Sequence, residues 1–183
     1  MSREDLQKAM KYFTPELLAR YGSPDDRVAD AAHAEWEAAT ERYQEHLRSV
    51  EHELPRRLRR LLRRYYLHDA GVPFVGVADQ VLHLTVELDA PPRDTLFLRY
   101  RLVSEPQVES HSLAKYDAQP LTWLYDELDV VRGGAFPVIE QRILFSNGRE
   151  LTIRFQDLNY STARALPLMA NGTTGPARVE AAG

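Results

Sequence analysis

The sequence predicts an α+β domain in which N-terminal helices pack on one face of an antiparallel sheet of about six strands. Apolar residues recur at steps of three and four in the N-terminal third of the chain, which is the period of an amphipathic helix. From about residue 74 the period falls to two, as in half-buried strands. Because helices followed by strands are typical of α+β domains, we expect helices within about 15–66 and strands within about 74–156.

Length and composition predict one domain. The chain has 183 residues, of which 44% are hydrophobic and 27% charged, and residues 1–166 suffice for a single core. The small and polar segment 167–183 is expected to be a disordered tail. A net charge of −4 gives no global attraction to phosphate or anionic lipid, and the absence of cysteine excludes disulfides and thiolate chemistry. A polar start and short apolar runs predict a cytoplasmic protein without a membrane span.

Proline and capping residues predict where the helices begin. Thr14 and Pro15 favour a short helix from Pro15 to Tyr21. Ser23 to Asp26 predict the start of a second helix, which should run to about Glu53 and place Trp36 in the main core. Pro55 disfavours helical geometry in the residue before it, so the arginine-rich stretch should form a separate helix after a kink.

Alternating residues predict the strands. The segments 81–88, "VLHLTVEL", and 95–102, "TLFLRYRL", each place apolar residues on one face. Further strands are expected at about 108–113, 121–131, 138–146 and 150–156.

The last hairpin predicts its own register. In "ILFSNGRELTIRF" a three-residue loop with Gly148 in the left-handed conformation sets Ile143 against Leu151 and Ile139 against Phe155. A two-residue loop would instead put Arg142 opposite Ile153 on an apolar face. The first register is therefore expected.

The polar face of the first two strands is the leading candidate for function. An aromatic side chain among arginines on an open sheet face could bind an acidic ligand. We therefore expect a non-catalytic binding or protein-interaction domain, a monomer or homodimer, whose partner is a protein or a small acidic ligand. The alternative is a solvated face on which Glu87 pairs with Arg99. The candidate binding residues are His83, Thr85, Phe97, Arg99 and Arg101.

Six arginines in the stretch 56–64 form the second candidate site. Between Asp25 and Glu53 there are nine acidic and three basic residues, so an excess of six acids precedes the six arginines. Mutual neutralisation of the two helices is the expected interpretation. A nucleic-acid surface built on Arg56, Arg60 and Arg63 is the alternative, although nucleic-acid binding is usually accompanied by a basic domain.

Three residues make up the enzymatic alternative, a hydrolase-like centre at His68, Asp69 and Asp126. The histidines lack the spacing that places two metal ligands on one helix face, so no metal or other cofactor is expected. The structural interpretation lets Asp69 pair with Arg64 or cap the turn at Gly71. For Asp126, on an apolar strand face, Arg142 is the expected partner.

Three segments resemble an uncharacterised bacterial protein family, a domain of unknown function whose members open with an MKYFT-like segment and carry an LHDA-like turn. They are "MKYFTPELLARY" (10–21), "LHDAG" (67–71) and "ILFSNGRELTIRF" (143–155). In this chain nine residues precede the MKYFT-like segment. The resemblance spans most of residues 10–155; it implies a soluble bacterial protein and transfers no catalytic residue.

Overall fold

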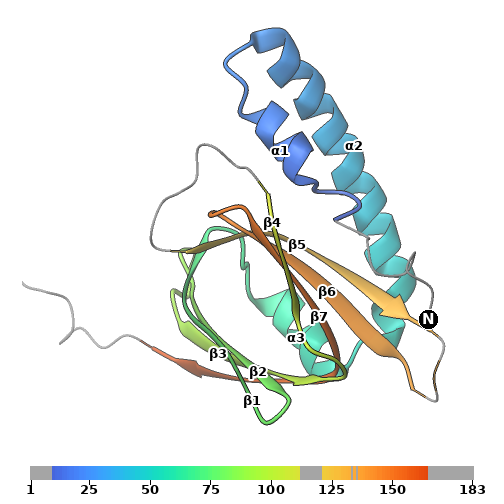
Figure 1. The fold of residues 1–183 in the computed structure, drawn as a ribbon, viewed down its shortest axis with the longest axis vertical. Coiled ribbons are helices and arrows are strands. Elements are labelled where there is room, and N and C mark those ends of the chain that lie inside the picture. The colour runs from blue at the N-terminus through green and yellow to red at the C-terminus, as the bar shows by residue number, and fades with distance from the viewer. Residues whose placement is uncertain (1–9, 112–120, 133, 135, 165–183) are drawn as a thin grey trace, which may run out of the picture.

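The computed structural model describes residues 10–111, 121–132, 134 and 136–164. Three α-helices lie in the N-terminal part of the chain, joined between the second and third by a short 3₁₀ turn (Figure 1). Their bounds are α1 Pro15–Tyr21, α2 Asp26–Val50, η2 Glu51–Glu53 and α3 Arg56–Arg64. The strands are β1 Ala70–Ala78, β2 Val81–Glu87, β3 Thr95–Leu102, β4 Gln107–Ser110, β5 Thr122–Val131, β6 Val138–Phe145 and β7 Arg149–Ala163. The tail expected at 167–183 lies outside the described residues.

The predicted α+β class is confirmed, with helices near the N-terminus and seven antiparallel strands where about six were expected. The helices do not share one face, since α3 packs inside the curved sheet and α2 packs on the opposite face of β5. The strand order is β3-β2-β1-β5-β6-β7-β4, and each pair of neighbours is antiparallel. The long strand β7 also pairs with β3, so β1, β2, β3, β7, β6 and β5 close into a ring. The closure is narrowest between β1 and β5, which share only two residue pairs.

The main core lies inside this curved sheet. Figure 1 shows α3 within the curve, and its Leu58 and Leu61 are completely buried there. The apolar residues of β2 and β3 that alternation assigned to one face all belong to this core. Burial of each such side chain stabilises the fold by about 1.5–3 kcal/mol.

A second, smaller core covers the opposite face of β5. Phe13 and Trp36 pack there against Tyr125, with ring centroids 5.4 and 4.5 Å from the Tyr125 ring. The prediction that Trp36 lies in the main core is therefore wrong, because the face of α2 that carries it packs on this outer cluster. The fully buried tryptophan of the main core is Trp123.

A bulge in β5 determines which of its side chains enter which core. Trp123 pairs with Phe145, but the next pair joins Tyr125 to Leu144, so one residue of β5 is left over. The extra residue is Leu124, which joins the second core instead of alternating into the same core as Asp126.

Local signals placed the helix starts and the last hairpin well. Thr14 caps α1 by accepting a hydrogen bond from the Leu17 N–H at 3.2 Å. The second helix starts at Asp26 with Asp25 as its N-cap, rather than at Ser23. The predicted hairpin register is confirmed, since Ile143 pairs with Leu151, Ile139 pairs with Phe155, and Gly148 has a φ of 75°.

Two buried carboxylates hold the MKYFT segment against the sheet. Glu127 on β5 accepts the backbone N–H groups of Lys11, Tyr12 and Phe13 at 2.8, 2.7 and 2.8 Å. Glu150 on β7 accepts a further hydrogen bond from the Met10 backbone. The segment thus satisfies its own backbone donors with acidic side chains, which explains why these acids are buried.

Candidate functional site

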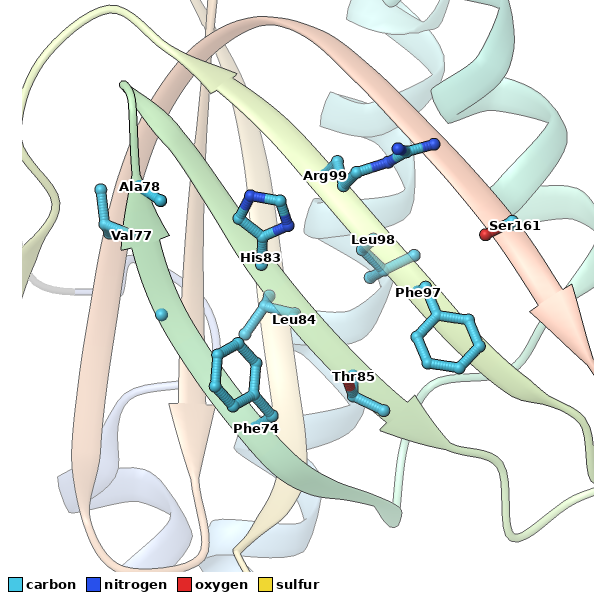
Figure 2. Close-up of a pocket in the computed structure, with 11 residues that line it drawn as sticks. Phe74, Val77, Ala78, His83, Leu84, Thr85, Phe97, Leu98, Arg99 and Ser161 are labelled. Carbon is cyan, nitrogen blue, oxygen red and sulfur yellow. The ribbon is translucent and has the colours of Figure 1, made fainter.

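A groove of about 400 Å³ lies on the outer face of the sheet, across β1, β2, β3 and β7. One row of paired residues crosses it, in which Phe74 pairs with Thr85, Thr85 with Phe97, and Phe97 with Ser161. Figure 2 shows the two phenyl rings on the same side of the sheet, on either side of Thr85. Because paired residues share a face, the strand register alone brings these side chains together.

The next row supplies the polar part of the groove. In this row Gly76 on β1 pairs with His83 on β2, and His83 pairs with Arg99 on β3. Figure 2 shows His83 and Arg99 on their neighbouring strands. Gly76 has a steric role here, since a Cβ atom at this position would lie 2.7 Å from the Cζ atom of Phe74. The missing side chain lets the Phe74 ring lie over its own strand and form one wall of the groove.

The apolar walls of the groove are exposed. Phe74 is 54% and Phe97 41% accessible, whereas the leucines on the other face of β2 and β3 are buried. Exposed aromatic side chains that line one groove on a solvent-facing sheet mark a surface that gains free energy when it is covered. Val77 and Ala78 extend this apolar surface along β1.

Arg99 lines the groove without an acidic partner among the described residues. The alternative pairing with Glu87 is absent, because Glu87 lies opposite Thr95 while Arg99 lies opposite His83. Arg101 is two residues further along β3, opposite Val81, and is not part of the groove lining. The guanidinium of Arg99 is therefore available to an anion from solvent.

The structure brings together four of the five sheet-face residues expected from alternation, namely His83, Thr85, Phe97 and Arg99. Phe74 and Gly76 also line the groove and were not expected from the sequence. An irregularity in the β1–β2 pairing between Gly71 and Phe74 hides the alternation of β1. The two segments "PFVGVA" (73–78) and "VLHLTV" (81–86) are separated by only two residues, Asp79 and Gln80, which both have positive φ and form a tight turn. This short spacing was the sequence signal that could have predicted a β1–β2 hairpin with Phe74 and Gly76 on the groove face.

The enzymatic candidates do not converge on one cleft in the described structure. His68 and Asp69 are close, with Nε2 and Oδ2 3.3 Å apart, and the His68 ring lies 4.7 Å from the Tyr125 ring. Asp126 faces the opposite side of β5, where it accepts hydrogen bonds in the main core. No described ion pair joins Asp69 to Arg64. Instead, Asp69 adopts a left-handed conformation, with a φ of 63°, in the turn before β1.

Asp126 has a different partner from the one expected. It accepts hydrogen bonds from Trp123 Nε1 at 3.2 Å and Gln141 Nε2 at 2.7 Å, while Arg142 pairs with Glu140 on the other face. The bulge in β5 and the alternation of β6 put Arg142 and Asp126 on opposite sides of the sheet. Burial raises the pKa of the Asp126 carboxyl, and the two hydrogen bonds only partly offset this.

The arginines of α3 are largely unpaired with α2. Arg63 pairs with Glu51 at 2.6 Å, and Arg57 reaches Asp157 of β7 at 4.0 Å. The expected neutralisation by the preceding helix is thus limited to one contact among the described residues. The remaining surface is a groove of about 560 Å³ lined by Arg56, Arg59, Arg60, Arg63 and Arg64.

Among residues 10–111, 121–132, 134 and 136–164, no group of three His, Asp or Glu side chains is placed to hold a metal ion. No helix in that part of the chain is long and apolar enough to cross a membrane. No family model matches the sequence, and no curated protein sequence matches it significantly.

Proposed function

We propose that this protein is a non-catalytic binding domain whose site is the groove on the outer face of β1, β2 and β3. The observation that carries the proposal is the presence of two exposed phenyl rings, Phe74 and Phe97, in one groove with Arg99. Within the described part of the chain, the Arg99 guanidinium has no acidic partner. A sheet face that only needed to be soluble would carry neither the apolar walls nor the gap left at Gly76.

The chemistry of the groove indicates a small acidic ligand with an aromatic or other flat apolar body. Its body would lie over Thr85 between the phenyl rings, which favour offset or edge contacts with an aromatic group. Its carboxylate, sulfonate or phosphate would accept hydrogen bonds from Arg99, with His83 beside it. The volume of about 400 Å³ is within the range of small-molecule sites.

The rival hydrolase proposal has less geometric support. Its three residues would have to share one cleft, but Asp126 lies with Trp123 and Gln141 on the core side of β5 while His68 lies against Tyr125. A general acid or base must come within hydrogen-bond reach of a substrate, and these positions do not offer one common substrate position.

Anilinonaphthalene sulfonate, an aromatic anion with a flat naphthalene ring, is a suitable probe. We expect the folded protein to bind it with enhanced fluorescence, and Arg99→Gln to weaken this binding roughly tenfold through loss of one charge-assisted contact. Phe97→Ser should weaken it by removing an apolar wall, and Gly76→Ala should do so by forcing the Phe74 ring out of place.

Matched controls are available elsewhere on the surface. Phe136→Ser removes a phenyl ring that is more exposed than those of the groove, and Arg149→Gln removes an exposed arginine; both residues lie outside the groove lining. Neither should change dye binding. The proposal is wrong if the groove variants bind the dye like wild type. It is also wrong if the wild-type protein binds no dye and Phe97→Ser turns a dimer into a monomer, because the groove would then be a dimer interface.

A further inference from the structure

The arginines of α3 form a single stripe along the helix. Five of them occur at positions 56, 59, 60, 63 and 64, which are the i, i+3, i+4, i+7 and i+8 positions of one helix face. The opposite face carries Leu58 and Leu61, which are buried in the main core. The stripe is therefore held in place by the core and turned to solvent.

The stripe carries positive charge that the described residues leave largely without acidic partners. Arg56, Arg59 and Arg60 make no ion pair or hydrogen bond to another described side chain, and of the stripe only Arg63 has an acidic partner, Glu51. The first turn of α3 contains no acid and no side-chain cap, so the positive end of the helix dipole adds to the same field. Like charges four residues apart also destabilise a helix, so the arrangement costs stability.

We propose that this arginine stripe is a binding site for the phosphate backbone of a polynucleotide. Within the described part of the chain, the residues that line the groove above the stripe are all arginines. A protein partner would need an apolar or aromatic anchor at the centre of the interface, and a membrane would need side chains that enter the lipid. A phosphate backbone needs only well-placed cations, and guanidinium groups contact phosphate oxygens in a bidentate manner.

The length of the stripe fits this ligand. From Arg56 to Arg64 the helix rises about 12 Å, at about 1.5 Å per residue. Successive phosphates of one strand are spaced about 3.4 Å along a nucleic-acid helix, so the stripe spans three to four phosphates. It therefore predicts binding without sequence preference, through the backbone and not through the bases.

The test is fluorescence anisotropy with a short labelled single-stranded RNA of mixed sequence. About four phosphate contacts on a single strand give a slope near −3 for log affinity against log salt, so wild-type affinity should fall roughly 50-fold between about 50 and 200 mM salt. The triple variant Arg56→Gln, Arg59→Gln, Arg60→Gln should bind at least about tenfold more weakly at low salt, with a slope shallower by about 2.

Control variants separate the stripe from net charge. Replacing three exposed arginines elsewhere, Arg27, Arg42 and Arg164, with glutamine changes the total charge equally and should leave the slope unchanged. The lysine variant of the three stripe arginines keeps the charge and should retain most of the slope. Arg99→Gln should not affect RNA binding, so the proposal stands or fails independently of the sheet-face groove.

Several results would overturn the proposal. The triple glutamine variant could bind RNA as well as wild type does, or the affinity of wild type for RNA could be independent of salt. The stripe could also bind anionic phospholipid vesicles or a poly-glutamate peptide more tightly than RNA. Thermal unfolding of each variant shows whether α3 is still in place. If the glutamine variant unfolds, the decision passes to the lysine variant, whose loss of salt dependence would equally reject phosphate binding.

Discussion

Replacing Glu127 with glutamine tests whether a buried carboxylate holds the N-terminal segment on the sheet. One oxygen of Glu127 accepts the N–H groups of Tyr12 and Phe13, and the other accepts the N–H group of Lys11. Glutamine has nearly the same shape but only one accepting oxygen. Its amide can serve Tyr12 and Phe13, and its NH₂ group then faces the Lys11 N–H, a donor against a donor.

The size of the effect follows from these contacts. A hydrogen bond to a charged group contributes about 1.5–3 kcal/mol, so losing one and weakening two predicts a loss of about 2–4 kcal/mol in the free energy of unfolding. For a protein of this size each kcal/mol lowers the melting temperature by about 2–4 °C, which predicts a decrease of roughly 4–16 °C.

Two measurements check this result. Urea unfolding gives the change in stability, and limited trypsin digestion reports on the segment itself, because cleavage after Lys11 should become faster in the variant. Asp129→Asn is the matched control. Its pair with Lys11 Nζ is about 30% exposed on both sides and should contribute only about 0–1 kcal/mol.

A loss below about 0.5 kcal/mol together with unchanged cleavage at Lys11 would refute the argument. It would mean that the apolar contacts of Met10 and Phe13, which are buried at 3% and 7% exposure, hold the segment without the carboxylate.

Two further predictions concern the polar groups inside the sheet. Because burial raises the pKa of Asp126 in the folded state, its protonated form is favoured there, so this residue adds stability below its unfolded pKa of about 3.9 and loses that contribution as pH rises through the folded value. The free energy of unfolding of wild type, relative to that of Asp126→Asn, should therefore increase as pH falls from neutrality toward 4. Urea unfolding at several pH values measures this difference, and a difference that does not change with pH would contradict the raised pKa. The buried hydroxyl of Tyr100 has no hydrogen-bond partner among the described residues, so Tyr100→Phe should leave stability unchanged or raise it by about 1 kcal/mol, and a loss of more than about 1 kcal/mol would indicate a partner such as a buried water.

Local sequence determined the elements that depend on near neighbours. Pro15, Gly22 and Pro55 set helix boundaries through backbone geometry that involves only adjacent residues. Alternation identified the polar faces of β2 and β3, and with them most of the candidate groove, because the period of two is a property of the strand itself. The register of the hairpin at Gly148 was also predictable from local sequence, since its loop and both its strands are contiguous in the chain.

Contacts between distant segments were decided by the tertiary structure. The pairing of β3 with β7 closes the sheet and brings Ser161 beside Phe97, a contact that no local pattern specifies. The bulge in β5 turned Asp126 away from Arg142, and one extra residue is enough to do this because successive side chains point to opposite faces.

The charged residues show most clearly the difference between what the sequence determines and what the tertiary structure decides. The number of arginines in α3 and the excess of acids before them are properties of the sequence, and together they suggested neutralisation. In the folded chain Glu127 and Glu150 accept hydrogen bonds from the backbone of residues 10–13. Among the described acids, Glu51 is the one that pairs with the arginine stripe. Sequence therefore determined which charges the protein carries, whereas the tertiary structure decided which of them meet, because an ion pair forms only where folding brings the two groups within a few ångströms.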